Sequence, residues 1–159
     1  MTEITCLDPK CKHSHRSFEG FTILSLGFIK EGSPNYLQHI YNCTNMTITI
    51  SELIEKNFQK EILDGDNKFK CAKCQKKQKC DKVVGLYELP KILIIHLKRF
   101  KSMYFYIKGE FQKDRTKIKI EESIDLKAFI QQKDNKSTKY NLYAIVNHEG
   151  DLEFGHYTA

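Results

Sequence analysis

The residues of this sequence that are best suited to chemistry are two short pairs of cysteines. Cys6 and Cys11 enclose four residues, and Cys71 and Cys74 enclose two. Zinc takes four thiolate or imidazole ligands in a tetrahedron, and a local pair supplies two of them at low entropic cost. A long segment separates the pairs, but each doubling of a loop adds only about 0.6 kcal/mol to the cost of closing it. The spacing therefore predicts one structural zinc ion (Zn²⁺) bound by all four cysteines.

Other assignments of the six cysteines stay open from the sequence. His13 lies close enough to Cys11 to serve as a ligand, Cys80 could replace Cys74, and the cysteines could hold no metal at all. An even number of cysteines would also suit three disulfides in a small secreted scaffold. The chain is long enough to fold without them, and the two-residue spacing favours a shared metal over a strained local disulfide. Cys43 has no neighbour at ligand spacing and is expected to pack or to lie in a loop.

Local patterns predict the elements that must position these pairs. Residues 6–18 suit a zinc knuckle, and residues 21–29, rich in β-forming types, suit a strand. Residues 49–52 have the form of a capping box and begin an apolar helical face that continues to Ile62, so we expect a helix that stops at residues 64–66. Further strands are expected at residues 83–89, 92–100, 118–126, 140–146 and 154–159. Of these, the strands at residues 92–100 and 140–146 are expected to be buried.

These elements predict an α+β fold class with a mainly antiparallel sheet, because strands outnumber helices and do not alternate with them. The formal net charge is +6, with much of the excess between Lys68 and Lys82, and could attract an acidic surface. The longest aliphatic run, residues 92–95, is far shorter than the roughly 20 residues of a membrane span, and the N-terminus lacks a signal-like segment. We therefore expect a soluble, intracellular protein of the cytoplasm or nucleus, with no membrane partner.

Longer motifs occur in three segments. The first is Cys11 to Ser14 with residues 19–26, and the second is Cys71-Ala72-Lys73-Cys74 followed by Leu-Pro-Lys-Ile-Leu-Ile-Ile-His-Leu-Lys-Arg-Phe at residues 89–100. The third is Tyr-Asn-Leu-Tyr-Ala-Ile-Val-Asn-His at residues 140–148, with Gly150 and then Gly-His-Tyr-Thr-Ala at residues 155–159. In this order they resemble the two zinc knuckles and the histidine box of the ubiquitin-specific proteases, the deubiquitinase family of papain-like cysteine proteases.

The resemblance implies a papain-like cysteine protease fold with a zinc ribbon in its fingers. Residues 1–159 would be a partial catalytic domain, with zinc-binding fingers and a helix over residues 1–85 and a palm with the histidine box over residues 86–159. His156 would be the catalytic histidine, and the substrate-binding residues would be His148, Gly155 and Tyr157. Without the resemblance, a lone histidine in a strand is most often structural. One departure is the first cysteine pair, because the family usually has two residues between these cysteines.

The reaction implied by the resemblance is thiol-dependent hydrolysis of the isopeptide bond at the C-terminal glycine of ubiquitin. A cysteine attacks as the thiolate, a histidine takes its proton and passes it to the leaving amine, and a carboxylate or amide orients that histidine. The family's cysteine box and third catalytic residue would lie outside this chain, which alone is expected to be inactive. The expected partners are ubiquitin and ubiquitinated proteins.

Two other functions fit parts of the sequence. A noncatalytic relative could hold ubiquitin without cleaving it, although the retained Gly155-His156-Tyr157 triplet argues against this. The lysines around Cys71 and Cys74 would also suit a nucleic-acid-binding zinc ribbon. That stretch lacks the interleaved aromatic residues of a base-stacking platform, so nucleic acid is not expected as a partner.

Overall fold

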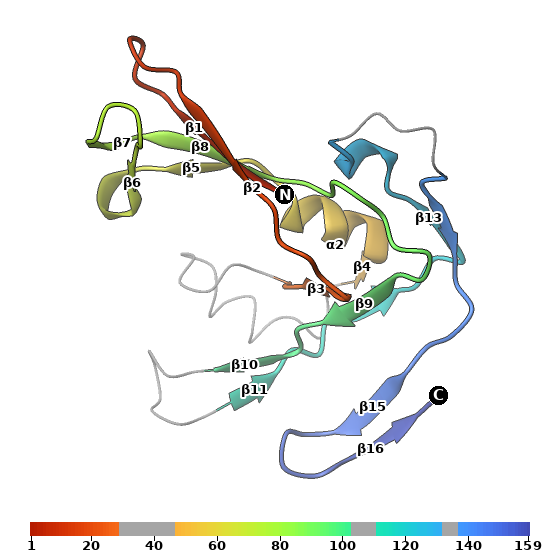
Figure 1. Ribbon diagram of the computed structural model, residues 1–159. Coiled ribbons are helices and arrows are strands. Elements are labelled where there is room, and N and C mark those ends of the chain that lie inside the picture. The colour runs from red at the N-terminus through yellow and green to blue at the C-terminus, as the bar shows by residue number, and fades with distance from the viewer. Residues whose placement is uncertain (29–46, 103–110, 132–136) are drawn as a thin grey trace. The chain divides into compact units, whose positions relative to one another are not determined.

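The structure is a computed structural model that describes residues 1–28, 47–102, 111–131 and 137–159 (Figure 1). The chain divides into two compact units, each assembled from separated segments. Unit 1 comprises Met1–Thr22, Phe58–Ile92 and Leu126–Thr138. Unit 2 comprises Ile23–Asn57, Leu93–Asp125 and Lys139–Ala159. Cys43 and the loop expected around it lie outside the described residues.

A four-stranded antiparallel sheet forms the frame of unit 1. Its strand order is β2-β1-β8-β5, with the bounds β1 Thr2–Cys6, β2 Ser14–Ser17, β5 Glu61–Leu63 and β8 Cys80–Val84. The register of β1 and β8 puts Cys6 directly opposite Cys80. The strand predicted over residues 83–89 therefore begins and ends earlier than expected. It stops because Leu86 leaves this sheet and forms an isolated parallel bridge to Ile130.

A smaller hairpin in unit 1 carries the second cysteine pair. Its strands β6 (Phe69–Lys70) and β7 (Lys77–Gln78) are antiparallel, and the pair lies in the turn between them. Two short 3₁₀ turns, η2 (Gly65–Asn67) and η3 (Lys127–Phe129), complete the unit. Its buried apolar residues are Cys6, Cys71, Cys80, Leu86 and Leu126. Because so much of this small core is thiol, what the cysteines bind matters for the stability of the unit.

Unit 2 contains one helix and paired strands among its described residues. The parallel pairs are β3 (Ile23–Leu26) with β9 (Ile94–Leu97), and β4 (Thr47–Thr49) with β12 (Lys117–Lys119). The antiparallel pairs are β10 (Phe100–Ser102) with β11 (Phe111–Lys113), β13 (Ser123–Asp125) with β14 (Lys139–Asn141), and β15 (Asn147–Gly150) with β16 (Gly155–Thr158). The core of the unit consists of Leu26, Phe28, Ile48, Ile50, Leu53 and Ile54.

The helix α2 (Ile50–Asn57) begins where the capping box predicts. The Thr49 hydroxyl accepts a hydrogen bond from the Glu52 amide at 3.1 Å, and the Glu52 carboxylate accepts one from the Thr49 amide at 2.8 Å. The predicted end at residues 64–66 is wrong. The helix stops at Asn57, whose side chain bonds both the amide and the carbonyl of Gly27, and residues 61–63 pair with β8 instead. Long-range pairing here overrides the helical periodicity.

Two strands predicted to be buried are shorter and more exposed than expected. The first, predicted over residues 92–100, is divided between β9, Ile94–Leu97, and the start of β10 at Phe100. The side chains of β9 alternate in burial, and Ile94 is 50% exposed. In the second, β14 ends at Asn141, and beyond it Tyr143 and Val146 are 79% and 69% exposed. An apolar run shows that a segment avoids water, but it does not show which of its faces other segments cover.

The fold class is nevertheless the predicted one. The described residues form an α+β structure in which antiparallel pairs outnumber parallel ones. Within the described ranges, no helix has the length and apolar character needed to cross a bilayer. The division into fingers over residues 1–85 and a palm over residues 86–159 stays a prediction.

Candidate metal centre and histidine hairpin

The two cysteine pairs come together in unit 1. The sulfur atoms of Cys6, Cys11, Cys71 and Cys74 all lie within 4.8 Å of one another, and those of Cys11 and Cys71 are 3.6 Å apart. A zinc ion with bonds of about 2.3 Å to four tetrahedral sulfurs would separate each sulfur pair by about 3.8 Å. The four-cysteine cluster therefore has the dimensions of a metal site, as the spacing predicts.

The two pairs form similar turns in spite of their different spacings. In each pair, the amide of the first cysteine donates a hydrogen bond to the carbonyl two residues after the second cysteine. The Cys6 amide donates to the His13 carbonyl at 2.8 Å, and the Cys71 amide donates to the Lys76 carbonyl at 3.0 Å. The residue directly after the second cysteine has a positive φ in both turns, 45° at Lys12 and 58° at Gln75. The departure of the first pair from the two-residue spacing therefore leaves the end of its turn unchanged.

Asp8 explains how the longer first turn is accommodated. Its carbonyl accepts a hydrogen bond from the amide four residues later at 3.1 Å, as the carbonyl of Cys71 does at 2.9 Å. Asp8 thus stands where the first cysteine of a two-residue spacing would stand. Its carboxylate accepts a hydrogen bond from Gln78 at 3.1 Å, and Cys6, two residues earlier, supplies the sulfur.

Backbone N–H groups directed at the sulfurs prepare them for a cation. A hydrogen bond from the backbone of Cys74 is the largest influence on Cys71, and the pKa of that thiol is lowered to about 7 although burial opposes this. At Cys11 the bond from the His13 backbone favours the thiolate, but burial and the adjacent thiols outweigh it and raise the pKa to about 11. A divalent metal binds cysteine in the thiolate form. Without a cation, neighbouring thiolates repel one another, whereas each of them would be attracted to a bound cation.

The two alternative ligands lie outside the set of sulfurs. Cys80 is buried and packs against Cys6 and Cys71, but its sulfur is not among the four that lie within 4.8 Å of one another. Burial is also the main cause of its raised pKa. His13 contributes its backbone carbonyl, which accepts from the Cys6 amide, and its ring is not a member of the set. The geometry thus selects the all-cysteine set.

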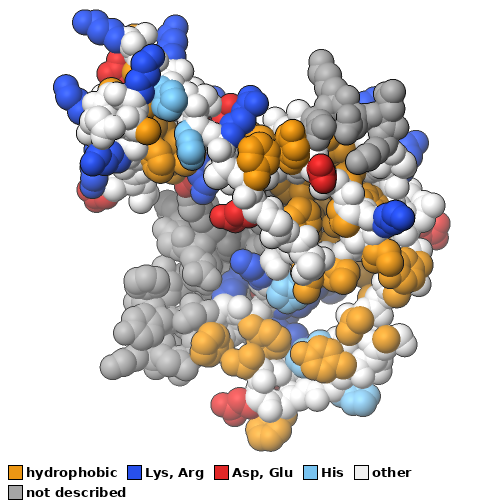
Figure 2. Space-filling model, viewed as in Figure 1, with side chains coloured by type: hydrophobic (Ala, Val, Ile, Leu, Met, Phe, Trp, Pro, Cys, Tyr) orange, Lys and Arg blue, Asp and Glu red, His pale blue; other side chains and the backbone are white. Residues whose placement is uncertain are grey.

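Exposed lysines surround the four-cysteine cluster. Figure 2 shows Lys and Arg side chains gathered around the part of unit 1 that carries β6 and β7. The exposed lysines of this stretch are Lys68, Lys70, Lys73, Lys76, Lys77 and Lys79. Four thiolates and one divalent cation carry a net charge of about −2, which nearby ammonium groups would partly offset. The charge run therefore does not by itself require a nucleic-acid partner.

The predicted histidine residues lie on a two-stranded hairpin of unit 2. In β15 and β16, His148 is opposite Tyr157, and Glu149 is opposite His156. Because side chains alternate between the faces of a strand, His148 and Tyr157 share one face while His156 and Glu149 share the other. The ring centroids of His148 and Tyr157 are 4.5 Å apart, whereas His156 is exposed. The structure thus brings three of the predicted site residues together, His148, Gly155 and Tyr157, and sets the His156 ring on the opposite face.

Contacts hold His148 on several sides. Lys113, the last residue of β11, places its ammonium nitrogen 3.0 Å from His148 Nδ1. Phe100 meets the imidazole edge to face, with centroids 5.6 Å apart. A Cβ added at Gly155 would lie 2.9 Å from His148 Cε1 and closer still to Nε2, so the ring occupies the space that only glycine leaves free.

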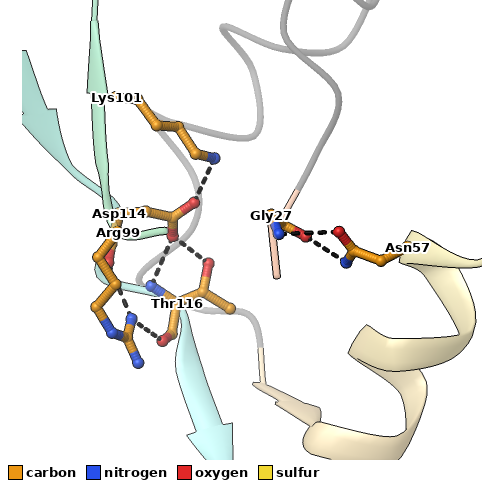
Figure 3. A network of polar contacts seen from close by, with 6 residues as sticks. All are labelled: Gly27, Asn57, Arg99, Lys101, Asp114 and Thr116. Carbon is orange, nitrogen blue, oxygen red and sulfur yellow. Dashed lines mark hydrogen bonds and ion pairs between the residues drawn. The ribbon is translucent and has the colours of Figure 1, made fainter. Parts of the chain in front are cut away.

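Asp114, the residue directly after Lys113 in the sequence, forms a buried ion pair with Lys101 (Figure 3). Asp114 accepts a hydrogen bond from the Lys101 ammonium at 2.6 Å and, through its other oxygen, from the amide and hydroxyl of Thr116 at 3.0 and 2.6 Å. Burial opposes ionisation of Asp114, but these hydrogen bonds outweigh it and lower its pKa to about 2. Arg99 donates to the carbonyls of Asp114 and Thr116, at 2.9 Å each. The network fixes the backbone directly after Lys113.

Comparison with known proteins shows the family of this chain. The family model described as ubiquitin carboxyl-terminal hydrolase matches residues 15–159. The chain belongs to this family. Human ubiquitin carboxyl-terminal hydrolase 2 is 31% identical over 159 residues, which cover 99% of this chain and 23% of that protein. The probable ubiquitin carboxyl-terminal hydrolase R319 of Acanthamoeba polyphaga mimivirus is 29% identical over 160 residues. The match covers 98% of this chain and 31% of that protein.

Solved structures show the same fold. The SAGA DUB module Ubp8/Sgf11/Sus1/Sgf73 bound to ubiquitin aldehyde contains a chain with a TM-score of 0.70 and 25% identity, and the match covers 98% of this chain and 32% of that one. The module bound to monoubiquitin matches with a TM-score of 0.70 and 24% identity. The chain thus spans about a quarter of human hydrolase 2 and about a third of the chain in these structures.

Three residues of this hydrolase-family chain that shape the histidine hairpin escaped prediction. Lys113 and Asp114 fall in a stretch with no clear periodicity, so nothing in the sequence marks them as anchors. Glu149, opposite His156, becomes visible only once the register of the hairpin is known. His96 lies on β9, where its Nδ1 atom is 3.4 Å from the Ser25 hydroxyl on the paired strand β3.

Proposed function

We propose that this chain is the zinc-binding and histidine-bearing part of a thiol-dependent deubiquitinase. The reaction is hydrolysis of the isopeptide bond at the C-terminal glycine of ubiquitin. The observation that carries the proposal is the family match over residues 15–159, which includes the hairpin with His156.

In this proposal His156 is the general base and general acid. It accepts the proton of the attacking cysteine thiol and later donates it to the leaving lysine amine. Its exposed position on β16 supports this role, since the ring must reach both a thiol and the substrate. A third group on the other ring nitrogen would orient it.

The nucleophile would come from outside residues 1–159. The sulfurs of Cys6, Cys11, Cys71 and Cys74 lie together in the four-cysteine cluster, where a metal would use them, and Cys80 is buried against them. None of these five cysteines is therefore suited to attack a substrate. Cys43 lies outside the described residues. The sequence around it, Tyr-Asn-Cys-Thr-Asn at residues 41–45, contains no glycine and does not resemble the family's cysteine box, which is rich in asparagine and glycine.

The metal is proposed to be one Zn²⁺ per chain, with a structural role. The four sulfurs of the cluster would fill its tetrahedron and leave no open position for water or substrate. When bound, it would join the turn after β1 to the turn between β6 and β7, which are far apart in the sequence. The donor set, all thiolates, suits zinc better than magnesium or calcium.

The proposed partners are ubiquitin and ubiquitinated proteins, and the proposed location is intracellular. Two solved structures that resemble this chain are described as bound to monoubiquitin and to ubiquitin aldehyde, which supports ubiquitin as the ligand. Gly155 would let the extended tail of ubiquitin approach the backbone closely, with His148 and Tyr157 beside it. An intracellular setting also suits a site built from reduced thiols.

A ubiquitin probe with a cysteine-reactive end tests the proposal. The chain alone should bind ubiquitin, seen as changes in its NMR spectrum, without becoming labelled. A catalytically competent polypeptide that contains this chain and a nucleophilic cysteine should be labelled and should cleave a ubiquitin conjugate. Labelling of the chain alone that disappears in Cys80→Ser would contradict the assignment of the nucleophile. Binding without cleavage by that polypeptide would favour a noncatalytic relative.

A further inference from the structure

The ammonium group of Lys113 has three acceptors within one hairpin. Its Nζ atom lies 3.0 Å from His148 Nδ1, 3.2 Å from the His148 carbonyl oxygen and 2.5 Å from the Gly150 carbonyl oxygen. An ammonium group has three hydrogens to donate and no lone pair to accept with. The three hairpin atoms therefore match its donors one for one. Lys113 is half-buried, and protein atoms can accept all three of its hydrogen bonds. A lysine on the open surface would donate these bonds to water instead.

These contacts determine where the proton of His148 lies. Because the ammonium can only donate, Nδ1 must accept, and the proton of the neutral imidazole is on Nε2. Phe100 and Tyr157 contact the ring, and its Nε2 and Cε1 atoms lie over the backbone of Gly155. A rotated ring or the other tautomer would lose the bond to Lys113.

The same contacts tie the hairpin to a neighbouring strand. A two-stranded hairpin of this length is at best marginally stable in water by itself. Lys113 ends β11, and its backbone is fixed by the pairing with β10 and by the buried Asp114 network. The Lys113 side chain contacts the face of the hairpin that carries His148, so it does not cover the opposite face, which carries His156.

We propose that Lys113 is a positioning residue that holds His148 in the Nε2–H tautomer and thereby holds β16, and with it His156, in place. This inference rests on the proposed function, because Lys113 can matter for catalysis only if His156 is a catalytic residue. Lys113 acts through His148 and the backbone of the hairpin and does not touch the substrate. A comparison at the same hairpin is Asp151, in the turn between β15 and β16. It pairs with Arg115 at 2.9 Å, although the side chains of Arg115 and Asp151 are 57% and 73% exposed. That pair is open to solvent and is expected to matter little.

The tautomer of His148 tests the inference in the chain itself. Two-bond ¹⁵N–¹H correlation spectra of the imidazole rings distinguish the two neutral tautomers, and the His148 signals can be assigned by their loss in His148→Gln. We expect the Nε2–H form in the wild type. Lys113→Met should convert it to a mixture, and Lys113→Arg, which also can only donate, should restore it. Lys117→Met removes an equal charge from an exposed position on β12 and should leave the signals unchanged.

Kinetics in the active polypeptide form the second arm. Lys113→Met should lower kcat by about ten- to a hundredfold through misplacement of His156, with little change in KM, and Lys113→Arg should recover part of the loss. An Nδ1–H tautomer in the wild type would overturn the inference even if Lys113→Met failed to fold. So would a Lys113→Met protein with unchanged tautomer and kcat. If the wild-type polypeptide hydrolysed nothing, the proposed function would fail while the tautomer result still decided the role of Lys113 toward the hairpin.

Discussion

The imidazole of His148 lies over Gly155 on the neighbouring strand, where a Cβ at residue 155 would come within 2.9 Å of Cε1 and within 2.8 Å of the Glu149 carbonyl oxygen. The second contact is with backbone, which cannot turn away as a flexible side chain can. Glycine at this position is therefore a packing requirement of the hairpin as well as an expected feature of a substrate channel.

Gly155→Ala should destabilise the hairpin by about 1–3 kcal/mol, because either the ring or the strand must move. Hydrogen exchange of the β15 and β16 amides would report this opening locally. Gly20→Ala is the matched control, since nothing lies within 4 Å of the space that its Cβ would enter. Equal protection of the hairpin in Gly155→Ala and the wild type would show that the ring is not held as described.

Metal analysis of the purified chain should find one zinc per chain. The double change Cys71→Ser and Cys74→Ser removes two of the four sulfurs and should abolish stoichiometric binding, with loss of protected amides in unit 1. Cys80→Ser should retain the zinc, since that sulfur lies outside the set. Zinc below about half an equivalent in the wild type, or unchanged in the double variant, would rule out the four-thiolate site.

The Lys101–Asp114 pair predicts a specific loss of stability in acid. The pKa of Asp114 falls from 3.8 to about 2 on folding. Its contribution is therefore complete above about pH 4 and is lost as the pH falls from there towards 2, when the carboxylate must be protonated. This shift corresponds to about 2 kcal/mol at neutral pH.

Asp114→Asn tests this contribution. The variant should be less stable than the wild type at neutral pH, and the difference should shrink between about pH 4 and pH 2. Denaturation followed through NMR signals of β10 and β11 keeps the measurement within unit 2, away from acid loss of a metal. Asp151→Asn, in the exposed pair with Arg115, should show little effect at any pH. A difference between Asp114→Asn and the wild type that stays constant with pH would refute the linkage.

The two late histidines should differ sharply in the active polypeptide. His156→Ala removes base and acid together and should lower turnover by about four orders of magnitude while ubiquitin binding survives. His148→Ala should act through position and cost much less, because it lies on the other face of the hairpin and transfers no proton. If His148→Ala proved as damaging with folding and ubiquitin affinity intact, the catalytic role would belong to the wrong histidine. If neither change affected turnover, the protease assignment would fail.

Local signals in the sequence were sufficient for several features of this protein. The spacing within each cysteine pair predicted ligands of one site, because a short loop keeps two sulfurs close whatever the rest of the chain does. The capping box predicted the start of α2, since its hydrogen bonds span three residues. The motif resemblance identified the family, although it could not tell how the hairpin residues divide between two faces.

Contacts between distant segments decided the rest. Helix α2 ends at Asn57 because Gly27 and β8 offer partners that the helical pattern cannot reveal. The apolar residues around Tyr143 are exposed because burial depends on which segment covers them. Lys113 became an anchor only when folding brought three acceptors of the hairpin within reach of its ammonium group. A lysine carries the same charge at every position in a sequence, and only the tertiary structure determines which acceptors surround it.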